Sequence, residues 1–588
     1  MKSMNVYDYA VVAAYMVMMV WIGIYFMRYN RGGSDYFRAG NKLNWWIAGL
    51  SAFMSSFSAY MYTGGAGIIY QEGLTGSFIL GSTALGILAG YLLFAKLWRR
   101  SRVTTILEFL DERFNLSSHQ VASWTYIPFN ILYCATAQYS LAIFITAAIG
   151  MDISYVIWIC GLVIMVYTLL GGLWAVAITD VVQFLVLLPV SLVLVPLALL
   201  KVDNFHSFFH SMPPGYFSIP SQQYPWYWLL VLMLLLVHGQ NTNPNAQRYF
   251  SVRDEAEAKK VALLCMLLFI AGIMTWTVPP MVMRYLYNDL SPYISLPNPH
   301  EGSYVVIAMM VLPHGLIGLM ISAIFAATMS SIASQYNSIS GIITKDIVAK
   351  LAGRDFTARS QLLLGMAATL AVGIITLLLS LAMAGSGQGS FKTMMKLSSL
   401  TGTLIATPLL LGFIYRKAPS WSFMFSFTLS AIVTLLVAFF PPLVDYLASL
   451  GPAMEFTVTT LAIFFTGLIA FLISPFIFKS SQREAARIKT FFTRLDTPVD
   501  TSREIDDSPI DHAPLAGFVG WMSIILGALI LPFTFIPAPL PDRMINLSLG
   551  SILVAFGGLL YYLGKEEEPE YGRKQESGVR SRKSEARR

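Results

Sequence analysis

The 588-residue chain has few charges, few cysteines and few histidines, and each shortage excludes a class of protein. Charged residues make up 12 % of the chain against roughly 25 % in soluble domains, whereas 56 % of its residues are hydrophobic. The three cysteines fall inside apolar stretches and offer neither a disulfide framework nor metal-ligand spacing. The seven histidines are scattered, and no acid, base and nucleophile gather within the apolar stretches, so we expect no enzyme. The composition predicts an integral membrane protein.

Fifteen apolar runs are long enough to cross a bilayer. They lie near residues 7–27, 46–70, 77–97, 120–148, 153–172, 176–200, 226–246, 262–284, 303–343, 360–384, 393–415, 420–440, 456–478, 516–536 and 546–563. The run at 303–343 is too long for one level crossing, so we expect it to tilt or to continue past the membrane. The sequence thus predicts an all-α membrane protein with about 15 transmembrane helices.

Lysine and arginine gather in alternate loops between these runs. The rich loops hold 33 of the 39 basic residues and lie at 28–45, 96–119, 247–261, 344–360, 416–417, 479–515 and 564–588. Because positive residues favour cytoplasmic loops, we expect an N-terminus outside and a C-terminus in the cytoplasm of a plasma-membrane protein, which agrees with an odd number of spans. The membrane topology then explains the net charge of +7, which therefore does not indicate nucleic-acid binding. The expected partner is membrane lipid.

The stretch from Ile321 to Asp346 carries six serines although it is otherwise fit to cross a bilayer. On a helix the carbonyl of Ala327 lies one turn before Ser331, beside the hydroxyls of Ser330 and Ser331. Neutral oxygens of this kind suit a hard monovalent cation such as Na⁺. The alternative is that these serines only let helices pack closely.

Two spans carry the marks of interrupted helices, which in transporters place the binding site near the bilayer midplane. The second span holds the run Ser55 to Ser58, with three glycines soon after it. The seventh ends in polar residues from His238 to Asn245 and includes Pro244, which removes a hydrogen-bond donor. These polar side chains either line a cavity or lie in a cytoplasmic loop. Since the two breaks are five spans apart, they favour two repeats.

The division of the chain follows from these marks. We expect a first helix and loop at 1–45, a transport core at 46–415 made of repeats 46–200 and 226–415, two peripheral helices at 416–478, a cytoplasmic connector at 479–515, two C-terminal helices at 516–563 and a charged cytoplasmic tail at 564–588. Residues 102–114 resemble a short amphipathic helix at the inner surface. We assign the last two helices no transport role.

Several polar residues in the predicted spans are candidates for ion or solute contacts. Asp180, near the start of the sixth span, either caps the helix or draws a cation in or out. Lys396 either reaches the membrane surface or anchors an anionic group of a solute. Gln240, Asn241 and Asn243 favour a solute with hydroxyl or amide groups.

Four stretches together resemble the sodium:solute symporter family, which includes the sodium/glucose and sodium/proline cotransporters. They are Ser34–Trp46, Thr179–Gln183, Ala246–Lys260 and Ala326–Asp346, and the resemblance spans about residues 30–480. It implies a five-plus-five inverted-repeat core with peripheral helices, and a sodium-coupled symporter that imports a small polar organic solute by alternating access. A monomer would be sufficient.

The resemblance implies a role for particular residues of this chain. Met54 and Phe57 would supply backbone carbonyls to Na⁺, together with the Ala327 carbonyl and the hydroxyls of Ser330 and Ser331. Asp180 matches an aspartate on the cytoplasmic sodium exit route of the family.

The solute half of the family site does not carry over. Ser56 and Met61 stand where sugar carriers have Asn and Gln, and Thr83 lies near the position of their glutamate. We therefore expect Ser56, Met61 and Thr83 near the solute without identifying it. Two alternatives stay open. One is a proton-coupled carrier on the same scaffold, which would need a titratable group in place of the Ser330 and Ser331 oxygens, where the sequence has none; the other is a transporter-like solute sensor.

Overall fold

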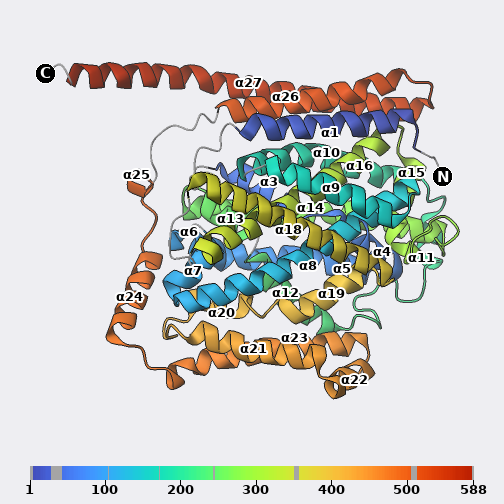
Figure 1. Cartoon of the computed structure of the whole chain (residues 1–588). Coiled ribbons are helices and arrows are strands. Elements are labelled where there is room, and N and C mark those ends of the chain that lie inside the picture. Colours follow the sequence, from blue (N-terminus) through green and yellow to red (C-terminus); the bar gives the residue numbers. More distant parts are fainter. Residues whose placement is uncertain are drawn as a thin grey trace.

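The computed structural model describes residues 4–27, 43–103, 105–170, 173–242, 245–349, 357–504 and 513–585, and every regular element in these ranges is a helix (Figure 1). The first half of the chain forms α1 (Val6–Met27), α3 (Trp45–Ser55), η2 (Ala59–Tyr62), α4 (Gly64–Glu72), α5 (Leu74–Ala89), η3 (Gly90–Phe94), α6 (Ala95–Ser101), α7 (Ile106–Arg113), α8 (Leu116–Ile149), α9 (Ile153–Leu170), α10 (Leu173–Leu199), α11 (Phe205–His210), α12 (Trp226–Gln240), α13 (Asn245–Ser251) and α14 (Glu255–Leu286).

The second half forms η4 (Pro299–Gly302), α15 (Ser303–Val311), α16 (Leu316–Gly341), η5 (Ile342–Ala349), α18 (Ala358–Gly385), α19 (Ser390–Thr401), α20 (Ala406–Ile414), α21 (Ser422–Phe439), α22 (Pro441–Ser449), α23 (Pro452–Ile477), α24 (Gln482–Asp496), α25 (Thr501–Glu504), α26 (Ala513–Ile530), η6 (Leu531–Phe535) and α27 (Leu540–Glu585). The all-α prediction is confirmed for the described part of the chain.

Each of the fifteen predicted runs overlaps a helix, but fewer of them are single straight spans. Ten described helices are long and apolar enough to cross a membrane, and the bent pair of α19 and α20 makes an eleventh. Other expected spans are broken, as in α3 and α4, or shorter, as in α9. The total of fifteen therefore stays a prediction, whereas a multi-span membrane protein is confirmed.

The long run at 303–343, expected as one span that tilts or continues past the membrane, is divided between two helices, so its treatment as one span was wrong. α15 ends at Val311, and a turn through Pro313 and Gly315 separates it from α16. Pro313 has no backbone N–H, and Gly315 adopts φ +89°, a conformation that other residues rarely take. The short α15 is almost wholly buried, so it packs inside the protein rather than continuing α16 through the membrane.

Helix α16 lies at the centre of the bundle, and every residue from Leu316 to Ala333 is buried. It packs against α1, α8, α10 and α18, which belong to different parts of the chain. A helix that is enclosed on all sides can hold polar groups only where neighbouring helices supply partners. The helical core fits the expected inverted-repeat fold, and its division into halves at 46–200 and 226–415 stays a prediction.

A buried carboxylate holds the N-terminal end of α16 in place. Asp8 of α1 is fully buried, and its Oδ1 accepts hydrogen bonds from the backbone N–H groups of Gly315 (2.7 Å) and Gly318 (3.3 Å). Its Oδ2 lies 3.0 Å from Nδ1 of His314. An anion at a helix N-terminus satisfies free N–H groups and the helix dipole, so α1 fixes the helix that carries Ser330 and Ser331.

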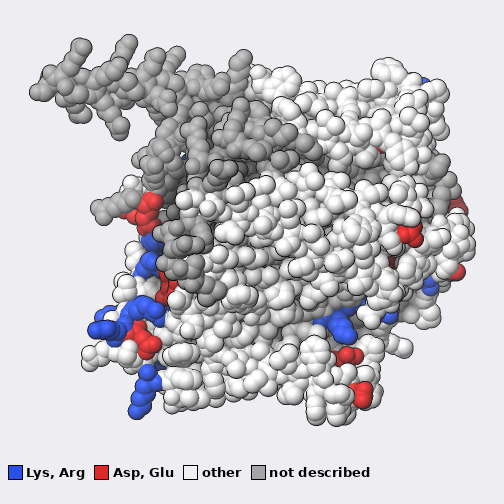
Figure 2. All heavy atoms as spheres, in the orientation of Figure 1, with Lys and Arg blue, Asp and Glu red and all other residues white. Residues whose placement is uncertain are grey.

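The two ends of the bundle differ in charge. Helices α6, α7, α13, α24 and α25 lie at one end, and α4, α11 and α15 lie at the other (Figure 1). Lysine and arginine gather at the former end on the face shown in Figure 2, where α24 exposes Arg483, Arg487 and Lys489. The amphipathic helix predicted at 102–114 is α7, which lies at this basic end.

Candidate functional site

The predicted break in the second span is present. α3 ends at Ser55, a short 3₁₀ turn follows, and α4 begins at Gly64. The Ser58 hydroxyl accepts a hydrogen bond from the N–H of Tyr60, which supports the turn in place of a continuing helix. The carbonyl of Phe57 lies in the non-helical stretch and is free to face another helix.

Ser331 of α16 meets this break through a group of neutral oxygens. Its Oγ lies 3.0 Å from the carbonyl oxygen of Phe57, 3.3 Å from that of Met54 and 3.0 Å from that of Ala327. A hydroxyl has one proton and can donate it to one carbonyl at a time. Four buried oxygens therefore converge around one hydroxyl proton, with the Met54 carbonyl also accepting from the N–H of Phe57 (3.2 Å), and neutral oxygens so placed suit a small cation.

Thr328 binds the same break just after Phe57. The N–H of Ala59 donates to Thr328 Oγ1 (2.9 Å), and that hydroxyl donates to the carbonyl of Ile324 (2.8 Å). This contact anchors the segment that follows Phe57 to α16. Sequence reasoning missed Thr328, although it lies in the same polar stretch as the serines.

Ser330 faces a charged network instead of the Ser331 cluster. Its Oγ donates to Oδ1 of Asp180 (3.0 Å) on α10, and Ser51 Oγ donates to Oδ2 of the same carboxylate (2.7 Å). Ser51 in turn accepts from Nε (3.3 Å) and Nη2 (3.2 Å) of Arg248, whose Nη2 also donates to Ser55 (2.6 Å). A titratable group, Asp180, therefore lies beside Ser330.

Arg248 was expected in a cytoplasmic loop, and that placement was wrong. It lies on the short helix α13, which packs against α3, α6 and α14 at the basic end of the bundle, and it is 2 % exposed. A buried guanidinium needs anionic or dipolar partners. Asp180, reached through Ser51, is the nearby anion. Arg248 belongs to the Ala246–Lys260 motif, so the signal that marks it was present in the sequence.

The second broken helix meets the first near the predicted solute residues. α12 ends at Gln240 and α13 begins at Asn245, which confirms the interruption. Ser56 Oγ lies 3.5 Å from Gln240 Oε1 and 3.3 Å from Asn245 Oδ1, and Asn245 Nδ2 donates to Gln240 Oε1 (3.0 Å). Hydroxyl and amide groups from both repeats thus face one another at the two breaks.

The other predicted solute residues lie in different surroundings. Asn241 donates to the carbonyls of Gly86 (2.9 Å) and Val237 (2.8 Å), so its amide ties α12 to α5. Met61 and Thr83 are buried on η2 and α5, whereas Lys396 is exposed on α19. Asn243 lies outside the described residues.

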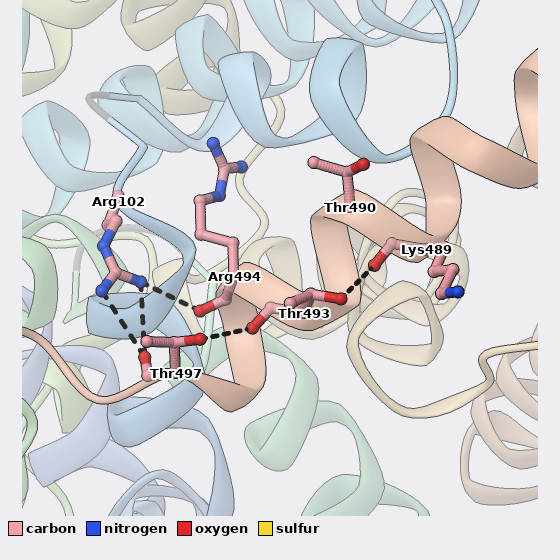
Figure 3. A pocket seen from close by; sticks show the side chains of 6 residues that line it. All are labelled: Arg102, Lys489, Thr490, Thr493, Arg494 and Thr497. Atoms are coloured by element: carbon pink, nitrogen blue, oxygen red, sulfur yellow. Dashed lines mark hydrogen bonds between the residues drawn. The ribbon is translucent and has the colours of Figure 1, made fainter.

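Other sites are poorly supported within the described residues. No group of three or more His, Cys, Asp or Glu side chains there is placed to hold a metal ion. A cavity of about 410 Å³ at the basic end is lined by Arg102, Lys489, Thr490, Thr493, Arg494 and Thr497. In Figure 3 its three cationic side chains point in different directions, and Arg102 and Arg494 already pair with Glu504 and Glu112. This cavity is therefore poorly arranged for an anion.

Two broken helices around buried neutral oxygens, inside an inverted repeat, define a secondary transporter. The chain belongs to the sodium:solute symporter family, whose model matches residues 36–426, and the resemblance noted from its motifs is confirmed. It is accordingly a sodium-coupled symporter, as its sequence predicted.

Relatives of known function are transporters. The chain is 27 % identical over 435 residues to the sodium/sialic acid symporter NanT of Aliivibrio fischeri. The aligned region covers 71 % of this chain and 85 % of that one. It is 27 % identical over 392 residues to sodium/glucose cotransporter 1 of Mus musculus, covering 59 % and 58 % respectively. A solved structure of a Na⁺-coupled sialic acid symporter, substrate-bound and outward-open, matches with a TM-score of 0.69 and 24 % identity over 81 % of this chain and 99 % of that one. The fold is therefore shared.

Proposed function

We propose that Na⁺ binds between Ser331 Oγ and the carbonyls of Met54, Phe57 and Ala327, and that its entry drives import of a hydroxylated solute. The convergence of these oxygens carries the proposal, because two come from the broken helix and two from α16. A cation there ties the two elements together and makes solute binding at the break depend on Na⁺. This dependence is reciprocal, so solute raises Na⁺ affinity by the same factor.

Ser330 and Asp180 are assigned to the path by which Na⁺ leaves. Ser330 lies next to Ser331 on α16, and its hydroxyl already contacts the Asp180 carboxylate. A cation that moves from the neutral oxygens toward the cytoplasm would next contact the Asp180 carboxylate. The basic end of the bundle supports a cytoplasmic location for α24 and the C-terminus, with the N-terminus outside the plasma membrane.

A sugar or sugar acid is the solute class that the site supports best. Ser56, Gln240 and Asn245 present hydroxyl and amide groups where the two breaks meet, and such groups suit neutral hydroxyls. The relatives are named for sialic acid and glucose, both of them polyhydroxylated. Lys396 is exposed, so it gives little support to an anionic requirement. The process is coupled movement rather than bond-making, and a monomer contains all the residues assigned to it.

One Na⁺ per cycle is energetically sufficient. A potential of about 100 mV contributes roughly 2.3 kcal/mol per charge, and a roughly tenfold Na⁺ gradient adds about 1.4 kcal/mol. Together they support roughly 500-fold accumulation of a neutral solute. Uptake need not involve a second ion.

Uptake of labelled sugars and sugar acids into proteoliposomes, with Na⁺, Li⁺ or K⁺ outside, tests the function. We expect accumulation of one class with Na⁺ only. Ser331→Ala should raise the half-saturating Na⁺ concentration about tenfold or more, because one oxygen is lost. The matched control is Ser322→Ala, since the buried Ser322 hydroxyl donates only to Gly318 of its own helix (2.7 Å). Unchanged sodium dependence in Ser331→Ala would falsify the assigned site.

A further inference from the structure

A buried carboxylate lies at the outer end of the bundle, away from the sodium site. Glu301 belongs to η4, in the segment between α14 and α15, and is 1 % exposed. Its Oε1 accepts a hydrogen bond from the backbone N–H of Phe391 (3.2 Å), in the first turn of α19. The N-cap of α19 is Gly389, which has no side chain to cap the helix. Glu301 therefore caps α19 from a different segment of the chain.

Glycines on both sides make room for this carboxylate. A Cβ atom on Gly67 of α4 would lie 3.1 Å from Glu301 Cγ, and one on Gly389 would lie 2.6 Å from Glu301 Oε1. A Cβ on Gly64 would lie 2.8 Å from the backbone nitrogen of Phe391. Segments from α4, η4 and α19 thus meet closely around Glu301, together with the Ser390 hydroxyl and the Tyr60 ring. This contact closes the outer side of the break that carries Met61.

Water lies within reach of Glu301 only if these elements separate. The neighbouring residue, His300, lines an outer pocket of about 410 Å³, together with Tyr70 and Glu72 of α4, Arg284 and Asp289. If α4 parts from α19 when the outer side opens, Glu301 would lose its enclosure and pass from its buried position toward that pocket. The carboxyl group would pass from a dry to a wet environment in each cycle.

We propose that Glu301 is a proton-sensitive plug of the outer gate: its neutral carboxyl seals α4 against α19, and its ionisation favours the open gate. The proposal rests on the proposed function only in taking α4 and α19 as walls of the solute route. Chemically, the site takes up a proton from outside and releases it there, so it regulates access and does not couple protons to transport.

The groups that face Glu301 determine the direction of the pH effect. Burial raises the pKa of Glu301, although backbone N–H groups of Ser390 and Phe391 and the charge of Lys392 on α19 act in the opposite direction. Burial and Lys392 lower the pKa of His300 to about 4, so this neighbour is neutral near pH 7. Tyr60 on η2 and Tyr139 on α8 are the other titratable groups facing the carboxyl.

These pKa shifts determine whether a rise in pH opens or closes the gate. The carboxyl has a higher pKa when buried in the closed gate than when exposed to water in the open gate, so the closed form binds the proton more tightly. Acid outside therefore favours closure, and a rise in external pH favours opening. Glu301→Gln cannot ionise but keeps an oxygen that can accept from Phe391, so it should stay closed at every pH.

Distances between spin labels on the two sides of the gate test this proposal. The labels replace Gln71 on α4 and Gln388 before α19, both exposed, while the native cysteines are at most 2 % exposed and remain unlabelled. In otherwise unaltered protein in nanodiscs, we expect the long-distance population to rise several-fold between pH 5 and 8. Glu301→Gln should keep the short distance throughout. The control is Glu72→Gln, which removes another carboxylate beside the same pocket and should follow the unaltered protein.

Two outcomes overturn the plug. One is a single distance at all pH values in the unaltered protein, and the other is an unchanged pH response in Glu301→Gln that still elutes as a folded monodisperse species. The proposed function is judged separately by uptake. If the distances respond to pH as expected but uptake does not depend on Na⁺, the plug stands and the proposed function fails.

Discussion

Two adjacent serines on α16 face opposite kinds of chemistry. Ser331 meets three backbone carbonyls and no charge, whereas Ser330 binds Asp180, which is linked through Ser51 to Arg248. Neutral oxygens hold a cation without cancelling its charge, so the ion can leave again. A buried carboxylate and guanidinium require each other, because either alone would be costly. The comparison agrees with the proposal that the neutral group binds the ion and that the charged network lies on its way out.

Removal of the buried guanidinium of Arg248 should have the largest effect on stability. Arg248→Met leaves Asp180 buried with its counter-charge removed, and breaking such a pair costs about 3–5 kcal/mol. We expect a large fall in the apparent melting temperature, measured by fluorescence-detected size exclusion. The double variant Asp180→Asn/Arg248→Met, which removes both charges, should recover much of it. Equal stability of Arg248→Met and the unaltered protein would show that the network is not paired.

Neutralising the carboxylate alone should separate ion binding from ion release. For Asp180→Asn we expect slower turnover, with the half-saturating Na⁺ concentration changing much less than in Ser331→Ala. The reason is that Asp180 contacts Ser330 and not the Ser331 oxygens. Uptake rates across a Na⁺ series, normalised to folded protein, provide the measurement. Normal kinetics would count against a role in release.

Removing the bridging hydroxyl should have a smaller effect. Ser51→Ala deletes one hydrogen bond to Asp180 (2.7 Å) and two longer ones from Arg248. We expect a loss of about 1 kcal/mol because both charges stay and can move toward each other. Thermal denaturation beside Ser322→Ala, which alters only a bond within α16, gives the comparison. A loss as large as that of Arg248→Met would show that the two charges cannot pair once the bridging hydroxyl is removed.

An exposed ion pair should contribute least. Arg416 and Asp496 lie 2.7 Å apart, with side chains 60 % and 56 % exposed. The Arg416 guanidinium lowers the pKa of Asp496, so any stability it contributes is complete above the ordinary value of about 4 and is lost only in stronger acid. Asp496→Asn should change stability by about 0.5 kcal/mol or less at neutral pH, and less at high salt. A larger loss would mean that the connector depends on this pair.

Much of the fold was predictable because the bilayer restricts the possible structures. Apolar length located the helices, and the polar runs at Ser55–Ser58 and His238–Asn245 located both breaks. The failures have physical causes. The run at 303–343 was treated as one span because composition does not show that α15 turns inward at Pro313. Arg248 was placed in a loop because its charge resembles the positive-inside signal of its neighbours.

By itself, the sequence determined that this chain crosses a membrane many times, that two of its helices are interrupted, and that Ser330 and Ser331 lie one helical turn beyond the Ala327 carbonyl. Only the tertiary structure decided that the two serines have different partners, with Ser331 facing the broken helix and Ser330 facing Asp180. The reason is that spacing along a helix sets which side chains share a face, while the approach of helices distant in sequence sets what that face meets.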